Sequence, residues 1–406
     1  MRLRRMLVFI LLEAFSPLAT DMSKKHYLFT PGPTPVPPSV AAAEARPLIH
    51  HRTAEFSRLF ESSSARLRWL FKTTQPVMIL AGSGTSAMEA ALINLTTRSS
   101  SVLVVRAGKF GERWGEIAAA YGLEVAALDA PWGETIGPAE LAAALREHPG
   151  VRAVCLTQVE SSTGVVFDIP ALTQITQEFG VLSLVDGITG IGAHPFDFDA
   201  WKVDAAVCGS QKALGMPPGL AFAALSERAW QAAEQCDLPR YYFDLRAYKK
   251  SLQDATTPFT PAISLVAALD QALDELQQVG LESLWQRHEI LATAVRLGAQ
   301  ALGLELLAKK SPCNILTAIL APPGVEVKKL LALLRGELGV SFVGGQGPLK
   351  GKVIRIGHLG FFNPFDIVTA LAALETGLHR LGYPLPIGAG VGAAHNYLIE
   401  HGAEAF

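Results

Sequence analysis

Short apolar runs alternate with longer amphipathic stretches along most of the chain, and this alternation is the strongest structural signal in the sequence. Most of the apolar runs are continuous, a pattern typical of strands buried on both faces of a mostly parallel sheet. Stretches of helical character at Ser86–Leu95 and Phe110–Tyr121 follow the first two runs. The pattern predicts an α/β fold. The predicted strands are Val77–Ala81, Val102–Arg106, Glu124–Leu128, Ala153–Thr157, Val181–Val185, Ala205–Cys208 and Leu220–Leu225.

The pattern differs on either side of this region. The sequence TPGPTPVPP, from Thr30 to Pro38, predicts an extended path instead of a helix, because proline fixes the backbone and lacks an N–H group. Apolar residues at helical spacing predict a helix over residues 53–72. After Pro261, helices and single strands predict a smaller α+β domain. Its helices are expected at 263–279, 281–302, 327–338 and 365–381, and its strands at Ile315–Leu320 and Val353–Ile356.

These patterns divide the chain into a proline-rich segment (27–47), a large domain (48–260) and a small domain (261–385). The glycine-rich end, residues 386–406, is expected to be an irregular tail. Residues 1–26 are expected to be a disordered or mis-started tail. Arginines before the apolar run Leu7–Leu12 imitate a signal peptide, but Glu13 ends that run early and Met22 offers a second start. An over-extended start, a floppy tail and a targeting segment therefore all remain open.

Composition narrows the function classes. The chain has 406 residues, 50% of them hydrophobic, which excludes a wholly disordered protein. Lys+Arg 35 against Asp+Glu 37 leaves no basic footprint for nucleic acid, and no apolar run is long enough to span a membrane. The four cysteines are far apart and form no CxxC pair, so neither a metal site nor a disulfide framework is indicated. We expect a cytoplasmic enzyme.

Polar residues follow several predicted strands, where open parallel sheets bind their ligands. Ser83, Gly84 and Thr85 could cradle an anion with free N–H groups at a helix start, or form an ordinary capped turn. Phe110 could cover a flat ligand or belong to the core. Ser161 lies in a polar turn, residues 158–164, that is either a ligand site or a simple turn.

Three charged residues extend this set. Asp186 directly follows a buried strand, so its carboxylate needs a cationic partner or a helix-capping role. Lys212 is enclosed by small residues, glycine and proline; a desolvated lysine can form a Schiff base, although a surface loop remains open. Arg355 lies inside an apolar strand and must pair with an anion, from a ligand or from the protein. Jointly these groups are what pyridoxal phosphate and an amino acid require.

The motifs TPGPTP, GSGTSAME, ESSTG, VDG, GSQKAL with PPG, TPFTP and RIGHLG follow one another along the chain. In this order and spacing they resemble the class V aminotransferases of fold type I, and among them the alanine/serine–glyoxylate (serine–pyruvate) group. The resemblance covers about residues 27–385. It implies a mostly parallel seven-stranded sheet with helices on both faces, a smaller C-terminal α+β domain, the cofactor pyridoxal 5'-phosphate, and a homodimer with shared active sites.

The resemblance also implies roles for individual residues. Lys212 would bind the cofactor and move protons, and Asp186 would keep the ring nitrogen protonated. Gly32 and Arg355 would bind the substrate carboxylate. The remaining cofactor contacts would come from Ser83, Gly84, Thr85 and Gln211 at the phosphate, Phe110 and Ile188 on the ring faces, Ser161 near the ring hydroxyl, and Thr257 and Thr260 at the phosphate of the neighbouring subunit.

The implied activity is ping-pong transfer of an amino group from alanine or serine to a small 2-oxo acid, glyoxylate or pyruvate. Two positions depart from some alanine–glyoxylate enzymes, which carry histidine at Thr85 and tyrosine at Thr257. Ureidoglycine or 2-aminoethylphosphonate as donor, and a catalytically idle homologue serving as a complex subunit, are the alternatives. A desulfurase is disfavoured, because Cys313 lacks the loop context that such enzymes need.

Overall fold

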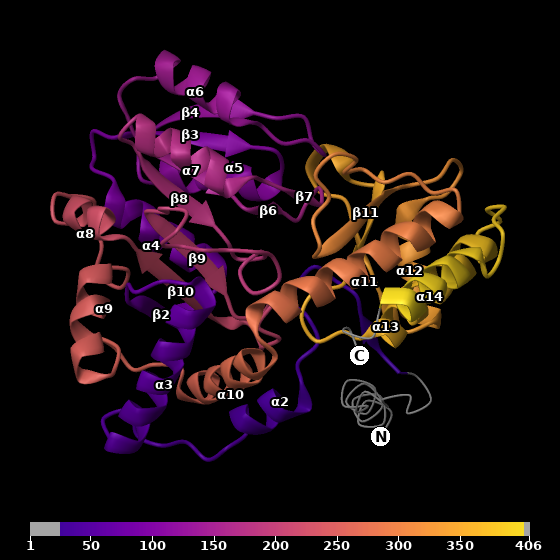
Figure 1. The fold of residues 1–406 in the computed structure, drawn as a ribbon, viewed down its shortest axis with the longest axis horizontal. Helices are drawn as coiled ribbons and strands as arrows, with labels where there is room; N and C mark the ends of the chain where they lie inside the picture. Colours follow the sequence, from indigo (N-terminus) through magenta and orange to yellow (C-terminus); the bar gives the residue numbers. More distant parts are fainter. Residues whose placement is uncertain (1–24, 402–406) are drawn as a thin grey trace, which may run out of the picture.

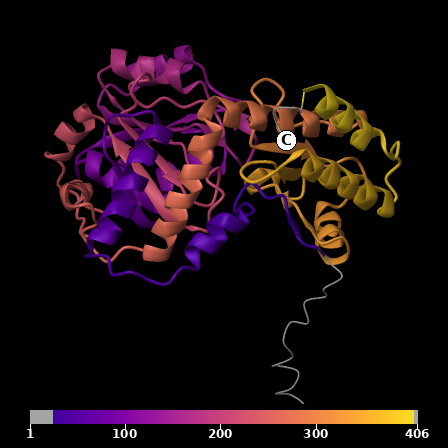
Figure 2. The same cartoon turned by 60° about the horizontal axis from the view of Figure 1, so that its bottom comes forward.

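The computed structural model describes residues 25–401 and shows a large part built on one sheet beside a smaller part (Figures 1 and 2). Helix α11 (Leu281–Ala301) runs between the two parts. The expected tail at residues 1–26 lies outside the described residues apart from its last two positions. No helix within residues 25–401 is long and apolar enough to cross a membrane.

The sheet of the large part has seven strands, as expected, in the order β2-β10-β9-β8-β5-β3-β4. Only β10 runs antiparallel to its neighbours, so the sheet is mostly parallel and the predicted fold class is confirmed. Every predicted strand is present to within a residue or two. The strands are β2 (Val77–Gly82), β3 (Ser101–Arg106), β4 (Glu124–Asp129), β5 (Val151–Thr157), β8 (Leu182–Asp186), β9 (Ala205–Gly209) and β10 (Gly219–Leu225).

Alternate side chains of the strands enter two different hydrophobic cores, one on each face of the sheet. In β2, Val77 and Ile79 join one core, whereas Met78 and Leu80 join the other. This alternation follows from the two-residue period of a strand, and it explains why the strand sequences are continuously apolar. The first face is covered by α3 (Ala54–Phe71), α6 (Pro138–Glu147), α7 (Ile169–Glu178) and α10 (Ile263–Val279); the second by α4 (Gly84–Leu95), α5 (Lys109–Ala120), α8 (Glu227–Ala233) and α9 (Leu245–Ser251).

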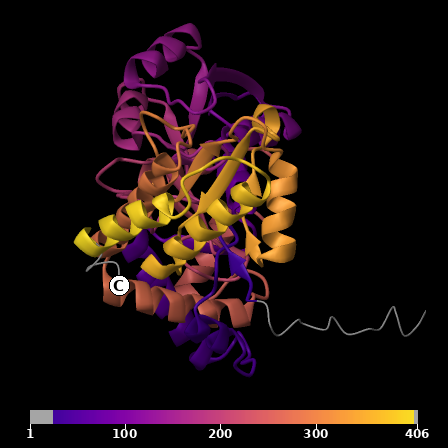
Figure 3. The same ribbon diagram turned by 90° about the vertical axis from the view of Figure 1, so that its right-hand side faces the viewer.

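The smaller part contains a three-stranded antiparallel sheet and its own core. The sheet order is β11 (Leu316–Leu320), β14 (Val353–Gly357) and β13 (Val343–Gly344). Helices α12 (Val327–Glu337), α13 (Pro364–Arg380) and α14 (Ala389–His401) pack there together with α11, and α13 lies beside α14 (Figure 3). Helix α10 does not belong to this part. Its buried residues join the core of the large part, although the sequence pattern grouped this helix with the small domain.

The proline-rich segment connects the two parts. Strand β1 (Tyr27–Leu28) pairs with β12 (Val340–Ser341), and the buried Phe29 packs in the core of the smaller part. The chain then runs without regular structure as far as helix α2 (Pro38–Glu44). The expectation that proline excludes a helix fails at Pro38. A proline in the first helical turn loses no hydrogen bond, because the N–H groups there have no intrahelical partner.

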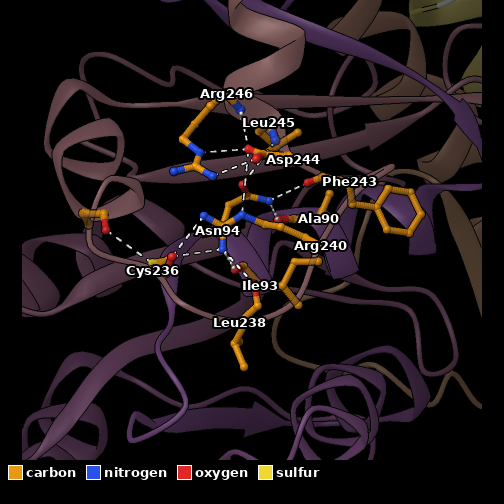
Figure 4. A network of polar contacts seen from close by, with 11 residues as sticks. Ala90, Ile93, Asn94, Cys236, Leu238, Arg240, Phe243, Asp244, Leu245 and Arg246 are labelled. Atoms are coloured by element: carbon orange, nitrogen blue, oxygen red, sulfur yellow. Dashed lines mark hydrogen bonds and ion pairs between the residues drawn. The ribbon is translucent and has the colours of Figure 1, made fainter. Parts of the chain in front are cut away.

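Helix α4 is fixed at its carboxyl end by the segment that precedes α9 (Figure 4). Asn94 Nδ2 donates to the carbonyl oxygens of Ala90 (2.7 Å) and Phe243 (2.6 Å), and Asn94 Oδ1 accepts from the N–H of Leu245 (3.2 Å). Arg240 Nη1 donates to further carbonyl groups of this region, those of Ile93, Cys236 and Leu238. The buried Asn94 amide and the Arg240 side chain thus hold residues 240–245 against the carboxyl end of the helix that begins at the expected anion cradle.

The glycine-rich end is a helix, α14, and not the irregular tail that its composition predicted. Gly390 lies against α11, and a Cβ atom built there would be 2.8 Å from Leu302 Cγ and 2.9 Å from the carbonyl oxygen of Gly298. Glu375 accepts the N–H groups of Gly388 (2.6 Å) and Val391 (2.9 Å) at the start of the helix. Gly390 therefore permits close helix packing, which offsets its low helix propensity.

Gly390→Ala should lower the free energy of unfolding by roughly 1–3 kcal/mol, because its methyl group would meet backbone atoms of α11. Gly392→Ala is the matched control on the same helix. Nothing lies within 4 Å of its Cβ position, so this change should be neutral or stabilising by up to ~1 kcal/mol. Urea denaturation of both variants measures the difference. Equal destabilisation would contradict the packing described for α14.

Candidate active site

The carboxyl ends of β2, β3, β5, β8 and β9 lie along one edge of the large sheet, since these strands are parallel to one another. Thr157, the last residue of β5, is paired with Asp186, the last residue of β8. The chain after these strands carries most of the residues singled out from the sequence. The fold therefore brings together groups that are far apart in sequence, as a ligand site at this edge requires.

The expected anion cradle forms at the start of α4. Ser83 precedes the helix, and within residues 25–401 no acceptor is found for the N–H groups of Gly84 and Thr85. A Cβ built on Gly209 would lie 3.2 Å from Gln211 Oε1, 3.4 Å from Ile188 Cγ2 and 3.6 Å from Gly84 Cα. Gln211 Oε1 is buried without a hydrogen-bond partner. A phosphate group accepts hydrogen bonds, so the open N–H groups at the helix start and the Nε2 group of the nearby Gln211 amide are donors that fit it.

Lys212 is partly buried just beyond the end of β9. Its Nζ donates to the carbonyl oxygen of Pro31 at 2.7 Å, and burial lowers the pKa of the ammonium group to about 8, although Asp186 acts in the opposite direction. Gly32 adopts φ +134, and a Cβ there would lie 2.3 Å from Lys212 Nζ. The proline-rich segment thus covers the lysine, and only glycine leaves room for it. A neutral amine is accessible near pH 8, as imine chemistry requires.

Asp186 is a buried carboxylate whose negative charge acts on Lys212. Its Oδ1 accepts the N–H of Ile188 at 2.8 Å, and within residues 25–401 no cation lies within 4.0 Å of its carboxylate. Burial raises the pKa of Asp186 to about 7; Glu160 adds to this, while Arg113 and Lys212 lower it. A buried carboxylate without an ion pair is costly. The protonated ring nitrogen of pyridoxal phosphate would supply the missing partner.

Glu160 fixes the aromatic residue that was expected to cover the cofactor ring. It lies at the end of β6 (Val159–Glu160), fully buried, and its Oε2 accepts the N–H groups of Phe110 (3.0 Å) and Gly111 (2.9 Å). Its Oε1 accepts from the hydroxyl of Ser162 at 2.6 Å. The carboxylate thus holds the first turn of α5, where a negative charge is favourable. Sequence reasoning noted Glu160 within a polar turn but gave it no role.

Arg355 reaches the site from β14 in the smaller part. Its Nη1 donates to the carbonyl oxygen of Ser161 at 2.6 Å and its Nε to that of Gly344 at 2.9 Å. Burial lowers the pKa of the guanidinium group to about 10, which Glu160 partly opposes. No carboxylate within residues 25–401 forms an ion pair with it. The positive charge of the guanidinium can therefore bind an anionic ligand. The contact also places the backbone of Ser161 in the site.

The structure does not bring Thr257 and Thr260 into the cradle of the same subunit. Thr257 Oγ1 donates to the carbonyl oxygen of Phe259 at 2.6 Å, and both threonines line a small cavity with Tyr242 and Tyr248. Within residues 25–401, neither has a hydrogen bond to Ser83, Gly84, Thr85 or Gln211.

Comparison with known proteins identifies the family. A family model described as aminotransferase class-V matches residues 26–353. The chain belongs to the class-V aminotransferases. It is 42% identical to the small subunit of a soluble hydrogenase from Synechococcus sp. (strain PCC 6716), over 93% of this chain and 99% of that protein. It is 35% identical to a serine–glyoxylate aminotransferase of Methylorubrum extorquens, over 94% and 98%. A crystal structure of an alanine–glyoxylate aminotransferase from Nostoc sp. superposes with a TM-score of 0.84 at 33% identity, over 87% and 95%.

Class-V membership makes the protein a transaminase that uses pyridoxal phosphate, and the residues present fit that cofactor. The open helix start and the Nε2 donor of Gln211 fit its phosphate, and the unpaired Asp186 fits its ring nitrogen. Cys313 is fully buried, and burial raises the pKa of its thiol, so it is not placed to act as a nucleophile.

In protein freed of cofactor, the neutral fraction of Lys212 should rise through pH 8, well below the range of an exposed lysine. Asp186→Asn should move this midpoint lower, because the lost carboxylate was favouring the ammonium form. The pH dependence of labelling by an amine reagent, followed at this residue by mass spectrometry, measures both midpoints. Asp129→Asn is the control; Asp129 pairs with Arg106 at the end of β4. A higher midpoint for Lys212 in the Asp186→Asn variant would refute the electrostatic effect of Asp186 on the lysine.

Proposed function

We propose that this transaminase moves the amino group of alanine or serine to glyoxylate. The observation that carries the proposal is the meeting of Lys212, Asp186 and Arg355 at one edge of the sheet, which supplies groups for an amine, a ring nitrogen and one carboxylate. A single guanidinium suits a small monocarboxylic substrate. The relatives named after serine, alanine and glyoxylate support this choice.

Each residue has a distinct part in the proposed reaction. Bound pyridoxal phosphate supplies an aldehyde and a ring that accepts electrons. Lys212 Nζ, with its lowered pKa, can take a proton from the substrate α-carbon and return it. The carboxylate of Asp186 would pair with the ring nitrogen and favour its protonated form. Phe110 and Ile188 would enclose the ring, and Ser161 would lie near its hydroxyl group.

Arg355 and Gly32 would bind the substrate α-carboxylate. The planar guanidinium can bind a carboxylate through two parallel N–H groups, which lysine cannot do. Gly32 lies against Lys212 Nζ, so the backbone at this position borders the reacting amine. Both donor and acceptor carry this carboxylate, and one guanidinium can therefore serve both halves of the ping-pong cycle.

Arg355→Lys should retain the bound cofactor and lower kcat/KM for both alanine and glyoxylate by roughly 30- to several-thousand-fold, the usual cost of truncating a buried charge pair. An amine substrate without a carboxylate should be nearly unaffected. Arg296→Lys is the matched control, because Arg296 also donates to a carbonyl oxygen, that of Cys313, away from the catalytic residues. Loss of cofactor with unchanged substrate kinetics would reassign Arg355 to the cofactor or to the fold.

We also propose that the active form is a homodimer in which Thr260 and Thr257 reach the partner's phosphate site. Next to these threonines lies an aromatic surface formed by Tyr241, Tyr242 and Phe259. Tyr241 is 82% exposed and Tyr242 39% exposed in the single chain, and contiguous exposed aromatic surface is typical of an interface. The four cysteines are free thiols, which supports the expected cytoplasmic location.

Mixing Lys212→Ala protein with Thr260→Ala protein should produce hybrid dimers in which one site is intact and the other carries both changes. Because Thr260 is expected to act only across the interface, activity of the mixture should exceed that of either parent. Mass spectrometry of the intact dimers confirms the exchange. Fully active monomer in sedimentation, or hybrids no more active than the parents, would exclude the shared site.

Screening amino donors against glyoxylate tests the proposed substrates. Alanine or serine should give the highest kcat/KM, and Lys212→Ala should reduce turnover to background. Preference for ureidoglycine or 2-aminoethylphosphonate would replace the donor while leaving the mechanism intact. The Synechococcus relative keeps open a subunit without catalysis. A purified protein that neither takes up pyridoxal phosphate nor transaminates any donor would favour that reading.

A further inference from the structure

Arg113 is a charged residue of the active site for which sequence reasoning found no role. It lies on α5, one helical turn after Phe110, so both side chains leave the same face of the helix. Its guanidinium carbon lies 4.8 Å from the centre of the Phe110 ring. Its Nη1 donates to Thr85 Oγ1 at 3.2 Å. The guanidinium is therefore held between the expected ring cover and the start of α4.

The charge of Arg113 acts on both catalytic residues and is not neutralised by a carboxylate. It lowers the pKa of Asp186 and that of Lys212. Within residues 25–401, Arg113 has no ion pair with Asp or Glu. Lys109, on the same helix, is paired with two carboxylates instead. A partly buried guanidinium held only by a hydroxyl group and a ring is placed to receive an anion.

The surroundings of Arg113 identify the class of anion. Thr85 belongs to the first turn of α4, where the N–H groups of Gly84 and Thr85 are open and the helix dipole favours negative charge. The substrate carboxylate already has Arg355, which enters from the smaller part. A phosphate dianion at the start of α4 would lie beside Thr85, within reach of a guanidinium that already contacts Thr85 Oγ1.

We propose that Arg113 binds the phosphate group of the cofactor, completing with its guanidinium the cradle formed by the N-terminus of α4 and Gln211. The planar fork would hold two phosphate oxygens, while Phe110 supports the guanidinium from its ring face. Arg113 thereby couples the residue that covers the ring to the residue that binds the phosphate. This inference concerns the cofactor and is independent of which amino donor the enzyme uses.

The experiment compares pyridoxal phosphate with pyridoxal, which has the same ring and aldehyde but no phosphate. Both are titrated into cofactor-free protein, and the dissociation constants are read from visible absorbance. The wild-type ratio Kd(pyridoxal)/Kd(pyridoxal phosphate) measures the contribution of the phosphate. Arg113→Gln should reduce this ratio by about 10- to 150-fold, the range for hydrogen bonds to a charged group. Arg113→Lys should reduce it less, because lysine keeps the charge and loses the fork.

Lys109→Gln is the matched control, since it removes one positive charge from the same helix at a side chain directed to Glu112 and Glu116. It should leave the ratio unchanged.

Equal weakening of both ligands by Arg113→Gln would overturn the proposal and assign Arg113 to the support of Phe110. An unchanged ratio with a raised KM for the amino donor would overturn it in favour of a substrate carboxylate. Circular dichroism of the cofactor-free variants separates these outcomes from misfolding. If Arg113→Gln does not fold, Arg113→Lys alone decides, and an unchanged ratio there refutes the proposal.

Discussion

The burial of Lys212 is the constraint on which the rest of the site depends. An ammonium group taken out of water is costly unless its surroundings compensate, and here they compensate only in part. The carbonyl oxygen of Pro31 accepts one hydrogen bond and Asp186 supplies a nearby negative charge, yet the pKa of the lysine remains lowered to about 8. The residual imbalance makes the amine available for chemistry. An ion pair with a carboxylate would raise the pKa of the lysine and leave less of the neutral amine that a transaminase needs.

This arrangement needs both parts of the molecule. The lysine follows β9 of the large sheet, whereas the segment that covers it is anchored by β1 to β12 and by Phe29 in the core of the smaller part. Arg355 also joins the two parts, because it extends from β14 of the smaller part and donates to the carbonyl oxygen of Ser161 in the large part. Hydrogen bonds from one part to backbone carbonyl groups of the other set the position of two cations. The amine of Lys212 and the guanidinium of Arg355 are thereby held in fixed positions relative to each other.

The site also carries more positive than negative charge. Lys212, Arg355 and Arg113 face Asp186 and Glu160, and burial raises the pKa of both carboxylates. A cofactor that brings a phosphate and a substrate that brings a carboxylate correct this imbalance when they bind. The same electrostatics explains the position of Glu160, whose charge is spread over the N–H groups of Phe110, Gly111 and Ser162. The carboxylate positions a ring without forming an ion pair with either arginine.

The sequence by itself determined the order of the elements and placed the candidate site residues directly after the strands. Continuous apolar runs specify the strands of the large sheet because both faces of each strand are covered, and glycine and polar residues directly after them lie at its carboxyl edge. Only the tertiary structure decided that α10 packs on the large part and that Gly390 meets Gly298 in a close helix crossing. It also decided that Glu160 binds the backbone of Gly111 and that Arg113 contacts Thr85. Each of these depends on a contact between residues distant in the chain. Local pattern records which face of an element is apolar, and it carries no information about which partner that face meets.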